Sequence, residues 1–328
     1  MVLIFMNCRY LFTLLVCISI TACQAETPSI PTSTPTNTPA RLIPTPRYDV
    51  PPSATQTARI PVTSTPKISP TSTETATHAS TSTTATETPI SNEWKNLPVL
   101  PEPSESIREI YQKGLSLGND TNAFSIFGDC QSRPEEFFGV FETYPLLVES
   151  LSLELRETVE HFNGSFNRES PTSQDGTTPG ALLWDQWHRG QFGCTFAETP
   201  VQCELRIHRP SFVIIQIGTH FESRNTEYLR KIITQLINEG VVPILATKAD
   251  NRELDDRVNR DMALLADEFN LPLWNFWASL SDLPDRGLYV MDGREEQGAV
   301  YLNEEAQEIH RITGLEALNI VWRVATGN

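Results

Sequence analysis

The stretch "PSFVIIQIG", residues 210–218, decides the fold that this sequence predicts. Its large apolar residues follow one another without the alternation of a half-exposed strand, so we expect a strand that is buried on both faces. Three further runs predict strands of the same sheet: "AFSIF" (123–127), "GVVPILATKAD" (240–250) and "LPLWNFW" (271–277). Strands of this kind belong to a parallel sheet that is covered by helices on both sides.

Helical patterns separate these strands. Leu229, Ile232 and Leu236 recur at spacings of three and four, and Gly240 ends the pattern. A long helix is expected after Asn303, which has the side chain of a helix N-cap. Alternating strands and helices predict an α/β domain whose strands are joined by right-handed crossovers.

The parallel sheet brings two polar turns to the same edge. Cys130 follows the strand at 123–127, and Thr219–Phe221 follow the strand at 210–218. Ligands of open α/β sheets bind beyond the carboxyl ends of the strands, near the point where the strand order reverses. We therefore expect the functional site at this edge.

The chain begins with the pattern of an exported protein. Arg9 precedes an apolar run at 11–20, which is the charge order of a secretory signal and is short for a membrane span. The run ends in "ITAC" (20–23), which resembles the lipobox of bacterial lipoproteins. The resemblance implies a signal peptide at 1–22, a lipid on Cys23, and a protein that is lipid-anchored at the outer face of a bacterial membrane. The alternative is an ordinary export signal in which Cys23 has no role.

Residues 23–96 form a Thr/Pro/Ser-rich linker, as in "TSTETATHASTSTTATETP" (71–89). Such a composition buries too little apolar surface to offset the chain entropy, so we expect disorder, stiffened by proline. The folded domain is expected at 97–328, a length that suits one domain with a full core.

The chain is acidic, with 41 Asp and Glu residues against 25 Lys and Arg residues and a net charge of -16. Binding to nucleic acid needs clustered cations, and the sequence contains no basic patch. We therefore expect no nucleic-acid partner.

Three cysteines fall in the expected domain. Cys194 and Cys203 flank a short loop that contains a proline, and in an oxidising compartment they are the natural disulfide. Cys130 is then left unpaired. The sequence has no CxxC pattern and no tight cluster of His and Cys, so we expect no structural zinc site. No other metal and no cofactor are predicted.

Three motifs carry a resemblance to a known family: "FGDCQS" (127–132), "IQIGTH" (215–220) and a DG-containing loop before the last helix. Together they resemble the SGNH/GDSL hydrolases, over residues 104 to 323. The resemblance implies a flavodoxin-like three-layer sandwich with about five parallel strands. It also implies hydrolysis of esters and acyl groups, often on lipids or acetylated glycans.

Cys130, after Gly128 and Asp129, stands where the family has its serine nucleophile. A thiolate attacks esters only where a neighbouring cation or base lowers its pKa, so Cys130 is either a nucleophile or a small inert side chain. Ser132 needs a different loop shape to serve instead. The glycine that donates to the oxyanion corresponds to Gly176.

Gly180 is the alternative to Gly176 for that oxyanion position. The family's oxyanion asparagine falls on His220, which can donate a hydrogen bond or act as the base of a rearranged Cys–His pair. Tyr301 stands where the family has its general base histidine, and Asp292 lies nine residues before it instead of three. His310 falls inside the last helix, too far along to reach the site. Tyrosine is a poor base at neutral pH, so the standard triad is absent.

Two other groups have both a functional and a structural interpretation. Lys248, Asp250 and Asn251 end a strand at the ligand side, where they either bind a polar group or form an internal ion pair. Four tryptophans either stack on sugars or pack in the core: Trp184, Trp187, Trp274 and Trp277.

Two functions remain as hypotheses. In the first, the domain has lost its triad and binds an envelope glycan or an acylated polysaccharide. In the second, it is an acyl or acetyl esterase with a rearranged site that uses Cys130, and it therefore meets an acyl-ester ligand.

Overall fold

A computed structural model describes residues 92–328 of the chain. The predicted signal peptide, the predicted lipid site Cys23 and the linker up to residue 91 lie outside the described residues. The first element, the 3-10 helix η1 (Asn92–Asn96), precedes the predicted domain boundary at 97, and its Trp94 is buried. Among the helices of residues 92–328, none is long and apolar enough to cross a membrane.

The core of the fold is a parallel sheet with the order β1-β2-β3-β4. The strands are β1 (Asp120–Gly128), β2 (Pro210–Gln216), β3 (Val242–Ala246) and β4 (Leu273–Trp274). Each lies within or across a run that the sequence predicts as a strand. The described sheet therefore has four strands, where the family resemblance implies about five.

A short segment beside β1 accounts for part of this difference. Ser173 forms an isolated parallel bridge with Gly128, and the Gly128 N–H donates to Thr172 O at 2.9 Å. This segment comes between β1 and β2 in the sequence but lies on the other side of β1. The order of the chain therefore reverses at β1, and the loop after Ser173 emerges at the same edge as Cys130.

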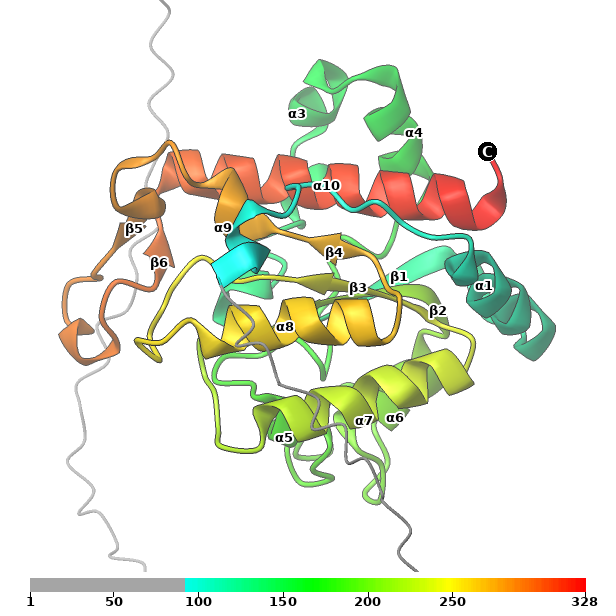
Figure 1. Cartoon of the computed structure of the whole chain (residues 1–328). Coiled ribbons are helices and arrows are strands. Elements are labelled where there is room, and N and C mark those ends of the chain that lie inside the picture. The colour runs from blue at the N-terminus through cyan, green and yellow to red at the C-terminus, as the bar shows by residue number, and fades with distance from the viewer. Residues whose placement is uncertain (1–91) are drawn as a thin grey trace, which may run out of the picture. The chain divides into compact units, whose positions relative to one another are not determined.

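The apolar run of β2 is continuous because each face of the sheet has its own core. Phe212 and Ile214 belong to one core, and Val213 and Ile215 belong to the other. The first core is covered by α1 (Ser106–Leu117), α4 (Leu153–His161) and α10 (Glu304–Thr326). The second is covered by α5 (Pro179–Leu182), α6 (Pro200–Ile207), α7 (Asn225–Asn238) and α8 (Arg257–Glu268). Figure 1 shows α10 on one side of the sheet and α7 and α8 on the other, which makes three layers.

The remaining elements are short and lie in the connections. They are η2 (Cys130–Ser132), α2 (Val140–Thr143), α3 (Pro145–Ser150), α9 (Phe276–Ser279), η3 (Pro284–Gly287), β5 (Leu288–Tyr289), η4 (Glu295–Gln297) and β6 (Tyr301–Leu302). Strands β5 and β6 pair antiparallel, with Tyr289 opposite Tyr301. The segment "DGREEQG" (292–298) lies in the connection between these two strands.

Two local predictions are confirmed. The Asn303 side chain caps α10 by accepting from the Ala306 N–H at 2.9 Å. Cys194 and Cys203 form a disulfide, which ties the loop before α6 to the helix itself. In residues 92–328, Cys130 is the free cysteine.

Candidate functional site

Asp129 joins the ends of β1 and β2 at the predicted edge of the sheet. Its Oδ2 accepts the backbone N–H groups of Gly218 and Thr219, at 3.1 and 3.0 Å. Gly218 has a φ of 149°, and a Cβ there would collide with the Val258 side chain, so the turn requires glycine. Burial raises the pKa of Asp129, although the hydrogen bond from Gly218 acts in the opposite direction. The buried Asp129 side chain therefore positions the turn after β2 against the end of β1.

Cys130 lines a cavity of about 270 Å³, which we call the Cys130 cavity. This volume is just under the range of about 300–1,000 Å³ that is typical of drug-sized ligands, so it suits one small polar ligand. The lining mixes aromatic, cationic, anionic and amide side chains. It consists of Cys130, Gln131, Arg133, Glu136, Asp175, Tyr289, Met291, Arg294, Tyr301, Leu302 and Gln307.

The surroundings of Cys130 keep its thiol protonated. Burial, followed by the charges of Asp129, Asp175 and Asp250, raises the pKa of Cys130 to about 12. A nucleophilic cysteine needs the opposite environment, with a cation or base that stabilises the thiolate. At neutral pH this side chain is a neutral thiol.

His220 does not complete a Cys–His pair. Its Nδ1 lies 3.5 Å from Arg252 Nη1, which donates toward it, and the ring is half-buried in the turn after β2. Among the described residues that line the Cys130 cavity, His220 is absent. A base that accepts the thiol proton has to reach it within hydrogen-bond distance, and His220 instead faces an arginine.

Tyr301, at the position of the family histidine, does reach the cavity. Its hydroxyl donates to Gln297 Oε1 at 2.6 Å and accepts from Arg294 Nη1 at 3.1 Å. The connection between β5 and β6 therefore folds back on Tyr301, and Arg294 lines the cavity beside it. Asp292, on the same connection, is exposed and is not among the described lining residues.

Of the two glycines proposed for the oxyanion position, Gly176 lies in the loop after Ser173 and Gly180 lies in α5. Gly176 adopts a positive φ of 76°, next to Asp175, whose carboxylate lines the Cys130 cavity. Gly180 opens α5, and its N–H donates to Glu222 Oε1 at 2.7 Å. The N–H of Gly180 is therefore engaged by the protein itself.

Lys248 and Asp250 form an internal ion pair at the end of β3. Lys248 Nζ lies 2.8 Å from Asp250 Oδ1 and 2.6 Å from Glu253 Oε2, and all three side chains are buried. Asp250 Oδ2 also accepts from Thr219 Oγ1 at 2.8 Å. Asn251 is exposed and caps the turn by accepting the Asp256 N–H. The buried side chains of Lys248, Asp250 and Glu253 therefore offer no open binding face.

A second cavity, of about 210 Å³, adjoins the first, and we call it the Trp187 cavity. Its lining consists of Arg133, Gln174, Asp175, Trp187, His188, Arg189, Gln191 and Phe192. Of the four tryptophans, Trp274 is buried in the core, and Trp277 stacks against Arg286. Trp184 is 55% exposed. The four tryptophans therefore do not form one sugar-stacking surface, and of the four only Trp187 lines one of these two cavities.

Several side chains that line these cavities are not predicted from the sequence. Arg133, Tyr289, Arg294 and Gln307 come from four separate connections or helices, and no motif groups them. Within residues 92–328, no group of three or more His, Cys, Asp or Glu side chains is arranged to hold a metal ion.

Comparisons with known proteins add little to this description. No family model matches the chain, and no curated protein matches it. Among solved structures, a GDSL-like lipase from Bacteroides thetaiotaomicron is similar, with a TM-score of 0.38 and 14% sequence identity. The match covers 66% of this chain and 98% of the lipase. A likeness this weak carries no argument about the site, which has to be judged on its own geometry.

Proposed function

We propose that this chain is an exported lipoprotein whose SGNH-like domain binds a glycan of the cell envelope without cleaving it. The lipid on Cys23 anchors the protein at the outer face of a bacterial membrane, and the Thr/Pro/Ser-rich linker carries the domain away from the surface. The glycan, plain or acylated, enters the Cys130 cavity.

The observation that carries this proposal is the raised pKa of Cys130, to about 12, in a cavity with ligand-binding side chains. A thiol that stays protonated is a poor nucleophile, and His220 is turned to Arg252. The cavity keeps aromatic faces, in Tyr289 and Tyr301, beside charged and amide groups that bind hydroxyls. Such a combination favours a sugar, which has both an apolar face and a rim of hydroxyls.

The test measures binding and turnover on the same preparation. The full-length chain in detergent is titrated with a panel of bacterial envelope glycans, with and without acetyl groups, beside Tyr301→Ala. Release of nitrophenol from a short-chain ester and of acetate from the acetylated glycans is followed beside Cys130→Ala. We expect saturable binding that Tyr301→Ala weakens at least tenfold, and no turnover above that of Cys130→Ala. Turnover that Cys130→Ala abolishes would instead establish the thiol esterase.

The anchor has an independent test. Cells that express the full-length chain are fed a radiolabelled fatty acid, and Cys23→Ala serves as the control. We expect label on the wild-type protein alone, because a thiol at residue 23 is the acceptor. Equal labelling of both proteins, or of neither, would remove Cys23 from the proposal.

A further inference from the structure

The two cavities are joined at one ion pair. Arg133 and Asp175 line both the Cys130 cavity and the Trp187 cavity, and Arg133 Nη1 lies 3.2 Å from Asp175 Oδ2. A guanidinium donates and a carboxylate accepts, so this junction offers both kinds of hydrogen bond to hydroxyls on either side of it. A ligand that fills the first cavity and continues past the junction enters the second.

The Trp187 cavity has an aromatic wall. Trp187 and Phe192 are half-buried, and a Cβ on Gly176 would lie 3.9 Å from Trp187 Cη2, so the indole packs beside the turn that carries Asp175. Arg189 and Phe192 adopt positive φ angles of 50° and 59°. A non-glycine residue in this region costs on the order of 1–3 kcal/mol, so this loop keeps a backbone conformation that Arg189 and Phe192 disfavour.

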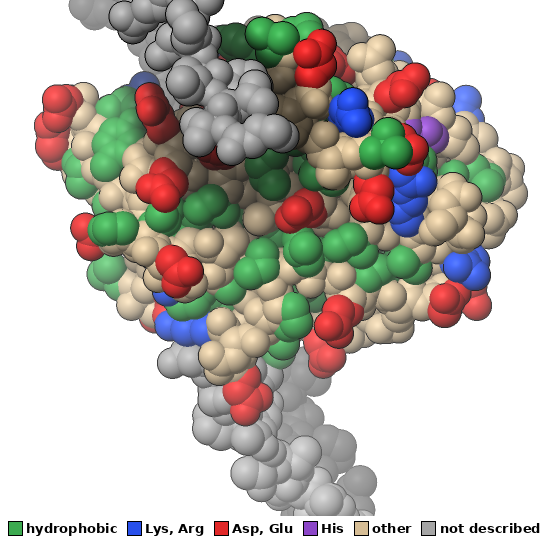
Figure 2. Space-filling view, turned by 90° about the horizontal axis from the view of Figure 1, so that it is seen from above, with side chains coloured by type: hydrophobic (Ala, Val, Ile, Leu, Met, Phe, Trp, Pro, Cys, Tyr) green, Lys and Arg blue, Asp and Glu red, His purple; other side chains and the backbone are tan. Residues whose placement is uncertain are grey.

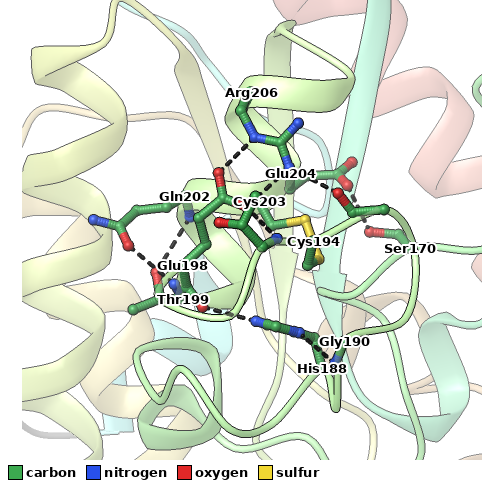
Figure 3. The surroundings of a disulfide bond; sticks show 12 residues. Ser170, His188, Gly190, Cys194, Glu198, Thr199, Gln202, Cys203, Glu204 and Arg206 are labelled. Atoms are coloured by element: carbon green, nitrogen blue, oxygen red, sulfur yellow. Dashed lines mark hydrogen bonds and ion pairs between the residues drawn. A yellow bond between two sulfur atoms is a disulfide. The ribbon is translucent and has the colours of Figure 1, made fainter.

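His188, the residue after Trp187, contacts the loop that the disulfide closes, as Figure 3 shows. His188 Nε2 lies 2.8 Å from the Glu198 carbonyl oxygen, and its Nδ1 accepts the Gly190 N–H at 3.0 Å. Glu198 lies in the loop that Cys194 and Cys203 close. The loop from Trp187 to Phe192 is therefore joined through His188 to the loop that the disulfide closes.

The charges of the two cavities favour a neutral or weakly acidic ligand. Together they contain three arginines, Arg133, Arg189 and Arg294, and two carboxylates, Glu136 and Asp175, which gives a formal charge of +1. The whole chain carries -16, and Asp and Glu side chains are spread over the face that Figure 2 shows. The two cavities are thus less acidic than the rest of the protein, and an aromatic wall beside planar polar groups is suited to sugar rings.

We propose that the Trp187 cavity is a second sugar subsite, so that the protein binds at least two consecutive units of a linear oligosaccharide across the Arg133–Asp175 ion pair. This inference rests on the proposed function, because the Cys130 cavity takes the first unit. The Trp187 indole covers the apolar face of the second unit. The ligand class is a neutral or weakly acidic, extended glycan chain.

The experiment uses a ladder of β-1,4-linked N-acetylglucosamine oligomers, from one to four units, titrated by calorimetry into the full-length chain in detergent. We expect the two-unit oligomer to bind at least tenfold more tightly than the monomer. Trp187→Ala should remove this gain and leave the monomer affinity unchanged. Trp184→Ala is the matched control, because this nearby tryptophan is 55% exposed and belongs to neither described lining.

Phe192→Gly provides a second variant that keeps the fold, since glycine relieves the positive φ at this position while it removes the ring. It should also reduce the gain from the second unit. Equal affinity for one and two units, with binding that only Tyr301→Ala weakens, would overturn the second subsite and leave the proposed function standing. Absence of binding by every oligomer would overturn both for this class of glycan.

Discussion

His310 Nε2 donates a 2.6 Å hydrogen bond to Gln216 Oε1, and both side chains are buried. Gln216 ends β2, and its backbone carbonyl accepts from Ser132 Oγ at 3.1 Å. The His310 ring packs against Phe137 and Trp274. In the described part of the chain its Nδ1 has no hydrogen-bond partner. The histidine of α10 thus holds the helix to the end of β2 and the loop after Cys130.

Substitution of His310 should therefore reduce stability. His310→Leu removes the shorter of two hydrogen bonds to the buried Gln216 Oε1 and leaves only that from Ser132 Oγ, at 3.4 Å. We expect a loss of about 1–3 kcal/mol in the free energy of unfolding, measured with urea. His220→Ala is the control and should change it by less than about 0.5 kcal/mol, because His220 is half-exposed. The double variant with Gln216→Met should recover part of the loss, since both polar partners are then removed. Wild-type stability for His310→Leu would contradict the structural role.

Two buried histidines predict how stability depends on pH. Burial, with the charge of Arg168, lowers the pKa of His208 to about 4, and burial lowers that of His310 well below its usual range. Below about pH 6.5 the unfolded chain binds protons that the folded chain does not, so stability is complete above that pH and is lost as the pH falls toward 4. The His208 share is about 3–4 kcal/mol, because its pKa falls from 6.5 to about 4 and each pKa unit corresponds to about 1.36 kcal/mol.

The check is the urea midpoint from pH 7 to 4 for the wild type and for His208→Gln. The variant should show a shallower decline. Asp129, with a raised pKa, acts in the opposite direction, because its folded form gains a proton first as the pH falls. This contribution is common to both proteins, so their difference isolates the histidine. Parallel profiles would exclude His208 as a source of acid sensitivity.

The raised pKa of Cys130 predicts low thiol reactivity. With a pKa of about 12 instead of about 8.5, the thiolate fraction at pH 8 falls on the order of a thousandfold. Alkylation by iodoacetamide should be slower by a comparable factor in the folded protein than in urea. Asp175→Asn removes one of the charges that raise the pKa and should speed the reaction modestly. Rapid alkylation of the folded protein would revive the nucleophile hypothesis.

The sequence predicts the scaffold better than it predicts the site. The continuous run at 210–218 marks a central strand because both faces of β2 are buried, and the spacing of Cys194 and Cys203 marks the disulfide. These are local patterns. The partners of His310 and the lining of the Cys130 cavity come from distant segments, so their contacts depend on tertiary packing that no periodicity encodes.

Lys248 provides the sharpest test of the buried network behind the site. Its ammonium group is the cation for two buried carboxylates, those of Asp250 and Glu253. Lys248→Met would leave the two buried carboxylates without this ammonium group. Removing one partner of a buried ion pair typically costs about 3–5 kcal/mol of stability. We expect this loss in urea unfolding at pH 7.

The matched control is Lys231→Met, since Lys231 pairs with Glu227 on the surface and both are exposed. It should cost less than about 0.5 kcal/mol, as surface ion pairs do. A triple variant, Lys248→Met with Asp250→Asn and Glu253→Gln, removes the charges together and should recover much of the stability. If Lys248→Met alone were as stable as the wild type, Lys248 would not be the cation that neutralises the carboxylates behind Thr219.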